Sequence, residues 1–105
     1  MIYQIIIKGS ADLDTDIIET YLTDNSISPE VILSPITNQI AKDLPEFPYM
    51  YPVCKYDKRY RKMPVNSYLV LYHVDEEKHR VEIHHIWHGM RNIKRLLEDD
   101  RTSST

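Results

Sequence analysis

Residues 67–87 are SYLVLYHVDEEKHRVEIHHIW, and this stretch decides the fold. Residues 67–74 are apolar on both faces of an extended chain and rich in β-branched and aromatic side chains, which predicts a strand inside a sheet. Residues 75–79 are polar and few enough to form a hairpin loop, and residues 80–87 return as a second strand. The two strands are therefore expected to pair antiparallel, with the first of them central.

The first part of the chain predicts one strand and a helix. Residues 2–7 are β-branched and stop short of Gly9, which is typical of a short strand. Ser10 is a favourable N-cap, and Asp12 in the first turn suits the helix dipole. Apolar residues then recur at helical spacing as far as residue 22.

A second helix and a proline-rich connector follow. Ser28 as cap and Pro29 at the first helical position predict where this helix begins. Pro35 interrupts its apolar face, and an interior proline removes a backbone hydrogen bond and clashes with the preceding turn. The helix therefore either kinks at Pro35 or begins there. Three prolines within residues 44–52 predict an extended connector.

The remaining elements complete an α+β fold. Residues 59–63 predict a strand before the central hairpin, and residues 90–97, after Gly89, predict a short C-terminal helix. The order is βααβββ followed by that helix, which predicts an antiparallel sheet packed on one face by two helices. We expect a single domain over residues 1–100 and a disordered tail over residues 101–105.

The net charge of −3 is spread unevenly. Residues 1–50 hold two bases against eight acids, and residues 51–105 hold eleven bases against eight acids. The densest basic stretch, residues 55–62, is KYDKRYRK. Basic residues interleaved with tyrosines suit a nucleic-acid backbone with bases to stack on, but a solvated connecting segment explains them equally well. The candidate nucleic-acid-binding residues are Lys55, Lys58, Arg59, Arg61 and, further on, His88.

The compartment is predicted from what the sequence does not contain. No apolar run approaches the roughly 20 residues that span a bilayer, so no membrane partner is expected. The N-terminus lacks the basic region and cleavage site of a signal peptide. Cys54 is the single cysteine, which excludes an internal disulfide. These features predict a cytoplasmic protein.

Metal and cofactor chemistry is not predicted. His84 and His88 would share a face of a strand at a separation of about 13 Å. They could not then hold one zinc ion, whose nitrogen ligands lie at about 2.0–2.1 Å. Cys54, beside Pro52, is more typical of a small packed hydrophobe than of a nucleophile. With only two glycines in the chain, no glycine-rich phosphate loop can form.

Residues 47–97 resemble the RelE/ParE superfamily of bacterial toxins. The resemblance rests on an ordered set of three motifs: FPYMYPV at residues 47–53, YLVLYHVD at residues 68–75, and VEIHHIWHGMRNI at residues 81–93. It implies the toxin component of a type II toxin–antitoxin pair, of the plasmid-stabilisation type. It also implies a cognate antitoxin as partner, for which the second helix and the tyrosines of the connector are the expected contacts.

The superfamily has two kinds of activity, and both stay open here. RelE-like members are endoribonucleases that cut mRNA in the ribosomal A site, bind RNA and inhibit translation. ParE-like members poison DNA gyrase, need no ribonuclease residues, and also cause growth arrest. A third alternative is a degenerate member that only binds its antitoxin. The partners implied are thus the ribosome and mRNA, or DNA gyrase.

The resemblance assigns three candidate catalytic residues. Lys62 and Arg91 align with basic residues that RelE-like toxins place near the scissile phosphate, where cations stabilise developing charge. His85 stands where many relatives carry arginine, and it can act as an acid or base near neutral pH. We expect the three to converge on the sheet face that the helices leave open. Leu69 and Leu97 depart from the ribonuclease pattern, in which an arginine and a tyrosine occupy these places.

Overall fold

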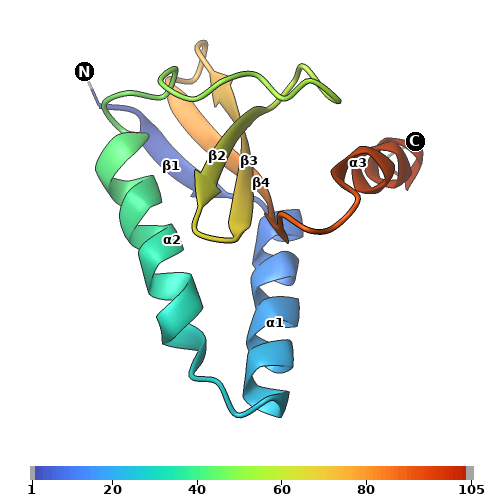
Figure 1. Cartoon of the computed structure of the whole chain (residues 1–105). Helices are drawn as coiled ribbons and strands as arrows, with labels where there is room; N and C mark the ends of the chain where they lie inside the picture. Colours follow the sequence, from blue (N-terminus) through green and yellow to red (C-terminus); the bar gives the residue numbers. More distant parts are fainter. Residues whose placement is uncertain (1, 104–105) are drawn as a thin grey trace.

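A computed structural model describes residues 2–103 as one sheet with helices on both sides (Figure 1). The elements are β1 (Gln4–Ile7), α1 (Gly9–Asp24), α2 (Pro29–Asp43), β2 (Arg61–Val65), β3 (Tyr68–Asp75), β4 (Arg80–His88) and α3 (Ile93–Ser103). The predicted α+β class and the order βααβββ plus a C-terminal helix are confirmed. Among the described residues, no helix has the length and apolar content needed to cross a membrane.

The sheet has the strand order β1-β4-β3-β2. β3 lies inside the sheet and pairs antiparallel with both β4 and β2, which confirms the central hairpin. β1 pairs parallel with β4, from Gln4 opposite Arg80 to Ile7 opposite Ile83, so the expectation of a wholly antiparallel sheet is wrong. No hairpin joins β1 to its neighbour, and its direction depends on where α1 and α2 carry the chain.

One face of the sheet carries the larger core, against α1 and α2. Tyr68, Val70 and Tyr72 of β3 contribute alternate residues to it, as expected for one face of a strand. Ala11 of α1 and Ile36 of α2 are buried in the same cluster. Both helices therefore pack on this face, as the sequence predicted.

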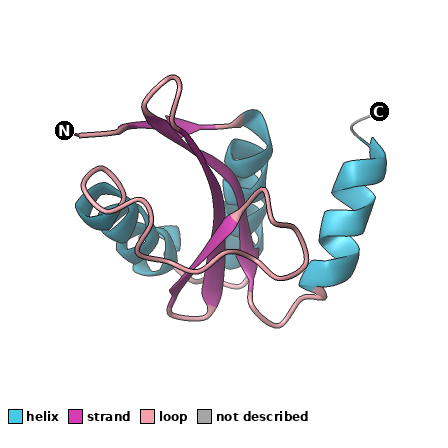
Figure 2. Cartoon of the chain, turned by 90° about the horizontal axis from the view of Figure 1, so that it is seen from above, coloured by secondary structure: helices cyan, strands magenta, loops and turns pink. Residues whose placement is uncertain are grey.

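The opposite face is covered as well, which the sequence did not predict. Cys54, Tyr60, Leu71, Trp87 and Leu97 form a second buried cluster there. Leu97 belongs to α3, and Figure 2 shows α2 and α3 on opposite sides of the sheet. The expectation that the opposite face is left open is wrong, because α3 docks there through a residue with no exposed surface. The burial of Cys54 agrees with its interpretation as a packed hydrophobe.

A β-bulge interrupts the pairing of β3 with β4. Leu71 pairs with His85, but the next residue, Tyr72, pairs with Ile83, so His84 is an extra residue in β4. The bulge puts the His84 ring 5.0 Å from that of Tyr60, in the second cluster. The prediction that His84 and His88 share one face of the strand is therefore wrong. His84 lies beside Tyr60 of the second cluster, whereas His88 lines the pocket on the other side of the sheet.

The ends of the helices differ from those predicted. Lys8, and not Ser10, is the N-cap of α1, and the Ser10 hydroxyl donates instead to the His84 carbonyl at 2.6 Å. α2 begins as expected, and Pro35 lies inside it, so the alternative start at Pro35 is wrong. α3 runs on to residue 103, six residues beyond the predicted end of the helix at residue 97 and into the predicted tail. Residues 104–105 of that predicted tail lie outside the described residues.

The connector between α2 and β2 is held against the sheet by hydrogen bonds to its carbonyls. Tyr72 donates its hydroxyl to Pro48 O at 2.7 Å, and Arg61 donates from Nη1 to Tyr51 O at 2.8 Å. β2 begins at Arg61, two residues later than predicted. Carbonyl groups of the connector thus accept hydrogen bonds from side chains of β2 and β3, because the connector does not pair with a strand along its length.

Candidate functional site

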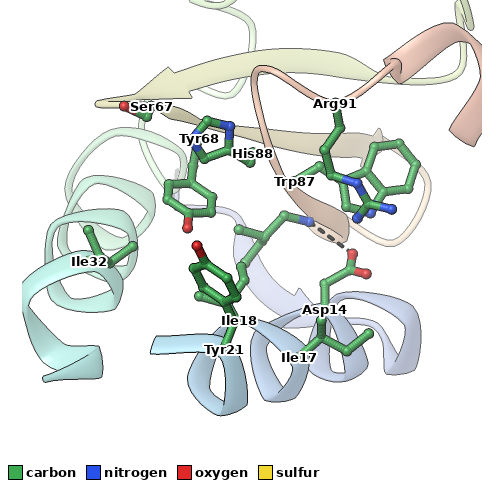
Figure 3. Close-up of a pocket in the computed structure, with 11 residues that line it drawn as sticks. Asp14, Ile17, Ile18, Tyr21, Ile32, Ser67, Tyr68, Trp87, His88 and Arg91 are labelled. Atoms are coloured by element: carbon green, nitrogen blue, oxygen red, sulfur yellow. Dashed lines mark hydrogen bonds between the residues drawn. The ribbon is translucent and has the colours of Figure 1, made fainter. Parts of the chain in front are cut away.

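A pocket of about 560 Å³ opens between α1, α2 and the ends of β3 and β4 (Figure 3). Most of the side chains around it are apolar or aromatic. The residues that line it are Asp14, Ile17, Ile18, Tyr21, Ile32, Ser67, Tyr68, Ile86, Trp87, His88 and Arg91. Two of the residues singled out from the sequence, His88 and Arg91, are therefore found here.

The pocket exists because β1 covers only half of β4. The pairing with β1 stops at Ile83, and α1 continues along the edge of β4 where β1 ends. A strand edge leaves backbone groups without partners. Two side chains of α1 pair with these backbone groups of β4. Asp14 Oδ2 accepts the Ile86 N–H at 3.1 Å, and the Ser10 hydroxyl donates to the His84 carbonyl.

Arg91 reaches the mouth of the pocket by a tight turn after β4. Gly89 donates its N–H to Ser67 O at 2.7 Å, and a Cβ on Gly89 would lie 3.3 Å from that same oxygen. This close approach favours glycine. Figure 3 shows the Arg91 guanidinium between Trp87 and Asp14. Arg91 is exposed and forms no ion pair within residues 2–103.

His85 is enclosed by two carboxylates from two helices. Its Nδ1 lies 3.2 Å from Asp14 Oδ2 and its Nε2 lies 3.4 Å from Asp100 Oδ2. The imidazole is stacked on the Trp87 ring with centroids 4.1 Å apart, and only 4% of the residue is exposed. Both ring nitrogens are therefore engaged within the protein, and His85 joins α1 and α3 to β4.

Lys62 lies on the edge strand β2, away from the pocket. It pairs with Leu71, which on its other side pairs with His85. At about 4.8 Å between neighbouring strands, Lys62 and His85 are about 10 Å apart at the backbone. The fully buried Leu71 stands between them. Arg91 lines the pocket, whereas Lys62 and His85 do not, and Leu97 of α3 covers the sheet face that was expected to be open. The convergence of Lys62, Arg91 and His85 stays a prediction.

The basic stretch at residues 55–62 is partly used within the protein. Arg59 forms an ion pair with the buried carboxylate of Asp57 at 2.7 Å, and its hydrogen bonds lower the pKa of that carboxyl. Arg61 bonds the connector and lies 4.9 Å from the centroid of the Tyr49 ring. These contacts give Arg59 and Arg61 structural roles, whatever else they bind.

The other candidate nucleic-acid-binding residues fall into two places. Lys55 and Lys58 are exposed, and Lys55 lies over the Tyr56 ring at 4.9 Å. His88 lines the pocket instead, where its Nδ1 accepts the Met90 N–H at 3.1 Å and its ring meets that of Tyr68. The structure brings Lys55 and Lys58 into one exposed segment and places His88 in another site.

Sequence reasoning missed the acid that organises the site. Asp14 precedes Ile17 by three residues and Ile18 by four, a spacing that puts it on the same side of α1. That signal was available, and it places Asp14 with Ile17 and Ile18 on the side of α1 that lines the pocket. Its pairing with His85, 71 residues further on, carried no local signal.

Replacing Asp14 by alanine is expected to lower the free energy of unfolding by about 1–3 kcal/mol. The change leaves the Ile86 N–H and His85 Nδ1 without their acceptor, and an unpaired buried polar group costs about that much. Urea denaturation followed by circular dichroism measures it. Glu19→Ala, an exposed acid beyond the first turn of the same helix, is the matched control. Equal stability of the two variants would contradict the role given to Asp14.

Comparison with solved structures first defines the class of fold. The chain resembles a chain of "the crystal structure of the toxin-antitoxin complex RelBE2" from Mycobacterium tuberculosis, with a TM-score of 0.64 and 19% identity. The match covers 84% of this chain and 99% of that chain. At this identity the likeness shows the fold alone. No curated protein matches the sequence.

The family is shown by a match to a family model. The model of the "ParE toxin of type II toxin-antitoxin system, parDE" matches residues 5–93, which is most of the chain. The chain therefore belongs to the ParE toxin family. This confirms the resemblance to the RelE/ParE superfamily and the prediction of a type II toxin, whose partner is an antitoxin.

Proposed function

We propose that this toxin acts by binding a protein target, DNA gyrase, and does not cleave RNA itself. The observation that carries the proposal is that both ring nitrogens of His85 face carboxylates, those of Asp14 and Asp100. Lys62 lies two strands from His85, with Leu71 between them, and Arg91 lines the pocket. The match to the ParE family model supports it. The proposal places the chain in the cytoplasm, where DNA gyrase acts.

The ribonuclease alternative requires groups that this arrangement does not offer. A general acid or base must come within about 2.6–3.2 Å of the proton that it transfers. The nitrogens of His85 face carboxylates of the protein, and the residue is buried. Leu69 and Leu97 are apolar where ribonuclease relatives carry an arginine and a tyrosine, and Leu97 is fully buried. Lys62 and Arg91 alone would bind a phosphate without a group to move its protons.

The purified chain is expected to inhibit supercoiling by DNA gyrase, and its induction is expected to arrest growth without new mRNA ends. Supercoiling assays and primer extension after induction measure the two effects in parallel. The double variant Lys62→Ala, Arg91→Ala is the control, because it removes both candidate phosphate-binding cations. New mRNA ends that disappear in this variant would overturn the proposal in favour of a ribonuclease. Neither inhibition nor cleavage would indicate a degenerate member.

A further inference from the structure

Residues 53–61, which we call the basic loop, form a closed loop that turns most of its bases outward. An antiparallel bridge joins its first residue to its last, and the Cys54 N–H donates to Tyr60 O at 2.8 Å. Between these ends, the Asp57 N–H donates to Cys54 O and the Tyr60 N–H to Asp57 O, which makes two consecutive turns. Every third side chain is turned inward, and at most 4% of Cys54, Asp57 and Tyr60 is exposed. The exposed residues between them are Lys55, Tyr56, Lys58 and Arg59.

The single acid of the basic loop is buried and is shared by two arginines. Asp57 Oδ2 lies 2.7 Å from Arg59 Nη2 and 3.6 Å from Arg101 Nη2, and hydrogen bonds from Arg59 lower the pKa of this carboxyl. By contrast, 53% of the Arg59 side chain and 61% of the Arg101 side chain are exposed. The carboxylate therefore positions two guanidinium groups at the surface and stays beneath it.

Arg101 brings the end of α3 to the same surface. The basic loop reaches toward α3 (Figure 1), and Lys58, Arg59 and Arg101 line a surface hollow of about 390 Å³ together with Asp57. Bases from two distant parts of the sequence are thus gathered around one hollow. The hollow and the exposed residues of the basic loop belong to one surface.

The charges of this surface are unequal even when all neighbouring acids are counted. The three acids of α3 are matched by three bases within Ile93–Ser103, so α3 adds no net charge. Asp100, one of these acids, faces His85 Nε2 at 3.4 Å. The basic loop itself holds four bases and one acid. The excess is positive and comes from the loop, in a chain whose net charge is −3.

A phosphate backbone is the chemistry that suits this surface, and a duplex suits it better than a single strand. Single-strand surfaces use rows of aromatic side chains on which bases stack. The basic loop exposes only Tyr56, and Lys55 Nζ lies over its ring at 4.9 Å from the centroid. Duplex DNA needs no stacking and presents one negative charge per about 1.7 Å of helix axis. Contacts to phosphates alone carry no sequence information.

We propose that the basic loop, together with Arg101, binds the phosphate backbone of duplex DNA without reading its sequence. Lys55 and Lys58 supply mobile point charges, and Arg59 and Arg101 supply guanidinium groups held in place by Asp57. The proposal goes beyond the proposed function, because it concerns DNA itself and holds whether or not DNA gyrase is the target.

Fluorescence anisotropy of a labelled duplex of random sequence, titrated with the full chain, tests the proposal. If the four cations neutralise four phosphates, the affinity should fall about 150-fold between 50 and 200 mM salt. Lys55→Ala with Lys58→Ala leaves two such contacts, and the fall should then be only about tenfold. Lys42→Ala with Lys78→Ala removes the same charge at exposed positions outside the basic loop and should keep the wild-type salt dependence. Thermal melting shows that each variant is folded.

Three results would overturn the proposal. The first is a wild type that does not bind the duplex at 50 mM salt, or a loop variant with the salt dependence of the control. The second is tighter binding of single-stranded DNA than of the duplex, with a loss of about tenfold in Tyr56→Ala, because this would indicate a stacking surface. The third is displacement of the duplex by less poly-L-glutamate, counted by charge, than by unlabelled duplex, which would indicate an acidic protein as the partner.

The proposed function is tested apart from this one, because the anisotropy assay contains no DNA gyrase. A wild type that leaves supercoiling unaffected removes gyrase as the target, while the altered salt dependence of the loop variant still supports the DNA surface. A wild type that inhibits supercoiling but binds no duplex by itself keeps the proposed function and overturns the DNA surface.

Discussion

Replacing Tyr72 by alanine is expected to lower the free energy of unfolding by about 3–5 kcal/mol. Tyr72 is fully buried in the central strand, within the core that joins the sheet to α1 and α2. The loss approaches the whole stability of a small domain, about 5–15 kcal/mol, because the cavity forms where the sheet and both helices meet. Chemical denaturation followed by circular dichroism gives the value.

Tyr72→Phe is the control, because it keeps the ring and removes only the hydroxyl. The hydroxyl donates to Pro48 O, and its loss is expected to cost about 1–2 kcal/mol. Burial raises the pKa of Tyr72 to about 12, so the folded protein holds the proton more tightly than the unfolded chain. That contribution is present below about pH 10 and is lost as the pH rises toward 12. Equal costs for the alanine and phenylalanine variants would contradict the role of the ring.

The central hairpin was predictable because its signals are local. Residues 67–74 are apolar on both faces, and a polar loop of five residues leads directly to the returning strand. Neighbours in sequence are then neighbours in the sheet. The two helices before it follow from the same kind of signal, since their apolar residues recur at helical spacing.

Features that depend on distant parts of the chain were missed or wrong. β1 pairs with a strand more than 70 residues away, and nothing within Gln4–Ile7 sets its direction. The bulge at His84 lies in the pairing of β4 with β3, and it moves one histidine to the other face. α3 was expected to be short, and its docking through Leu97 against Trp87 could not be read from a helix that is mostly polar.

The candidate site could be predicted only in part, for the same reason. Lys62, Arg91 and His85 were chosen by alignment with relatives, and each is a residue type that suits phosphate chemistry. Whether such side chains meet depends on strand order, and Leu71 of the central strand separates two of them. Asp14 lies 3.2 Å from His85 Nδ1, and no local signal around either residue indicates this contact.

Leu97→Ala is expected to undock α3, with a loss of about 2–5 kcal/mol in the packing of that helix. Leu97 is the member of α3 with no exposed surface, while Ile93 and Leu96 are only partly buried against the second cluster. A helix of 11 residues is marginal in water without such packing. Undocking also frees His85 Nε2 from Asp100.

Trp87 makes this undocking measurable in native buffer, because it is the single tryptophan and only 6% of it is exposed. Its emission should shift to the red in Leu97→Ala, while circular dichroism of the sheet changes little, since β3 and β4 keep the larger core beneath α1 and α2. Lys94→Ala, an exposed position on the same helix, should leave the emission unchanged. A red shift in neither variant would show that α3 stays docked without Leu97, and that the His85–Asp100 contact and the half-buried Ile93 and Leu96 suffice to hold it against the sheet.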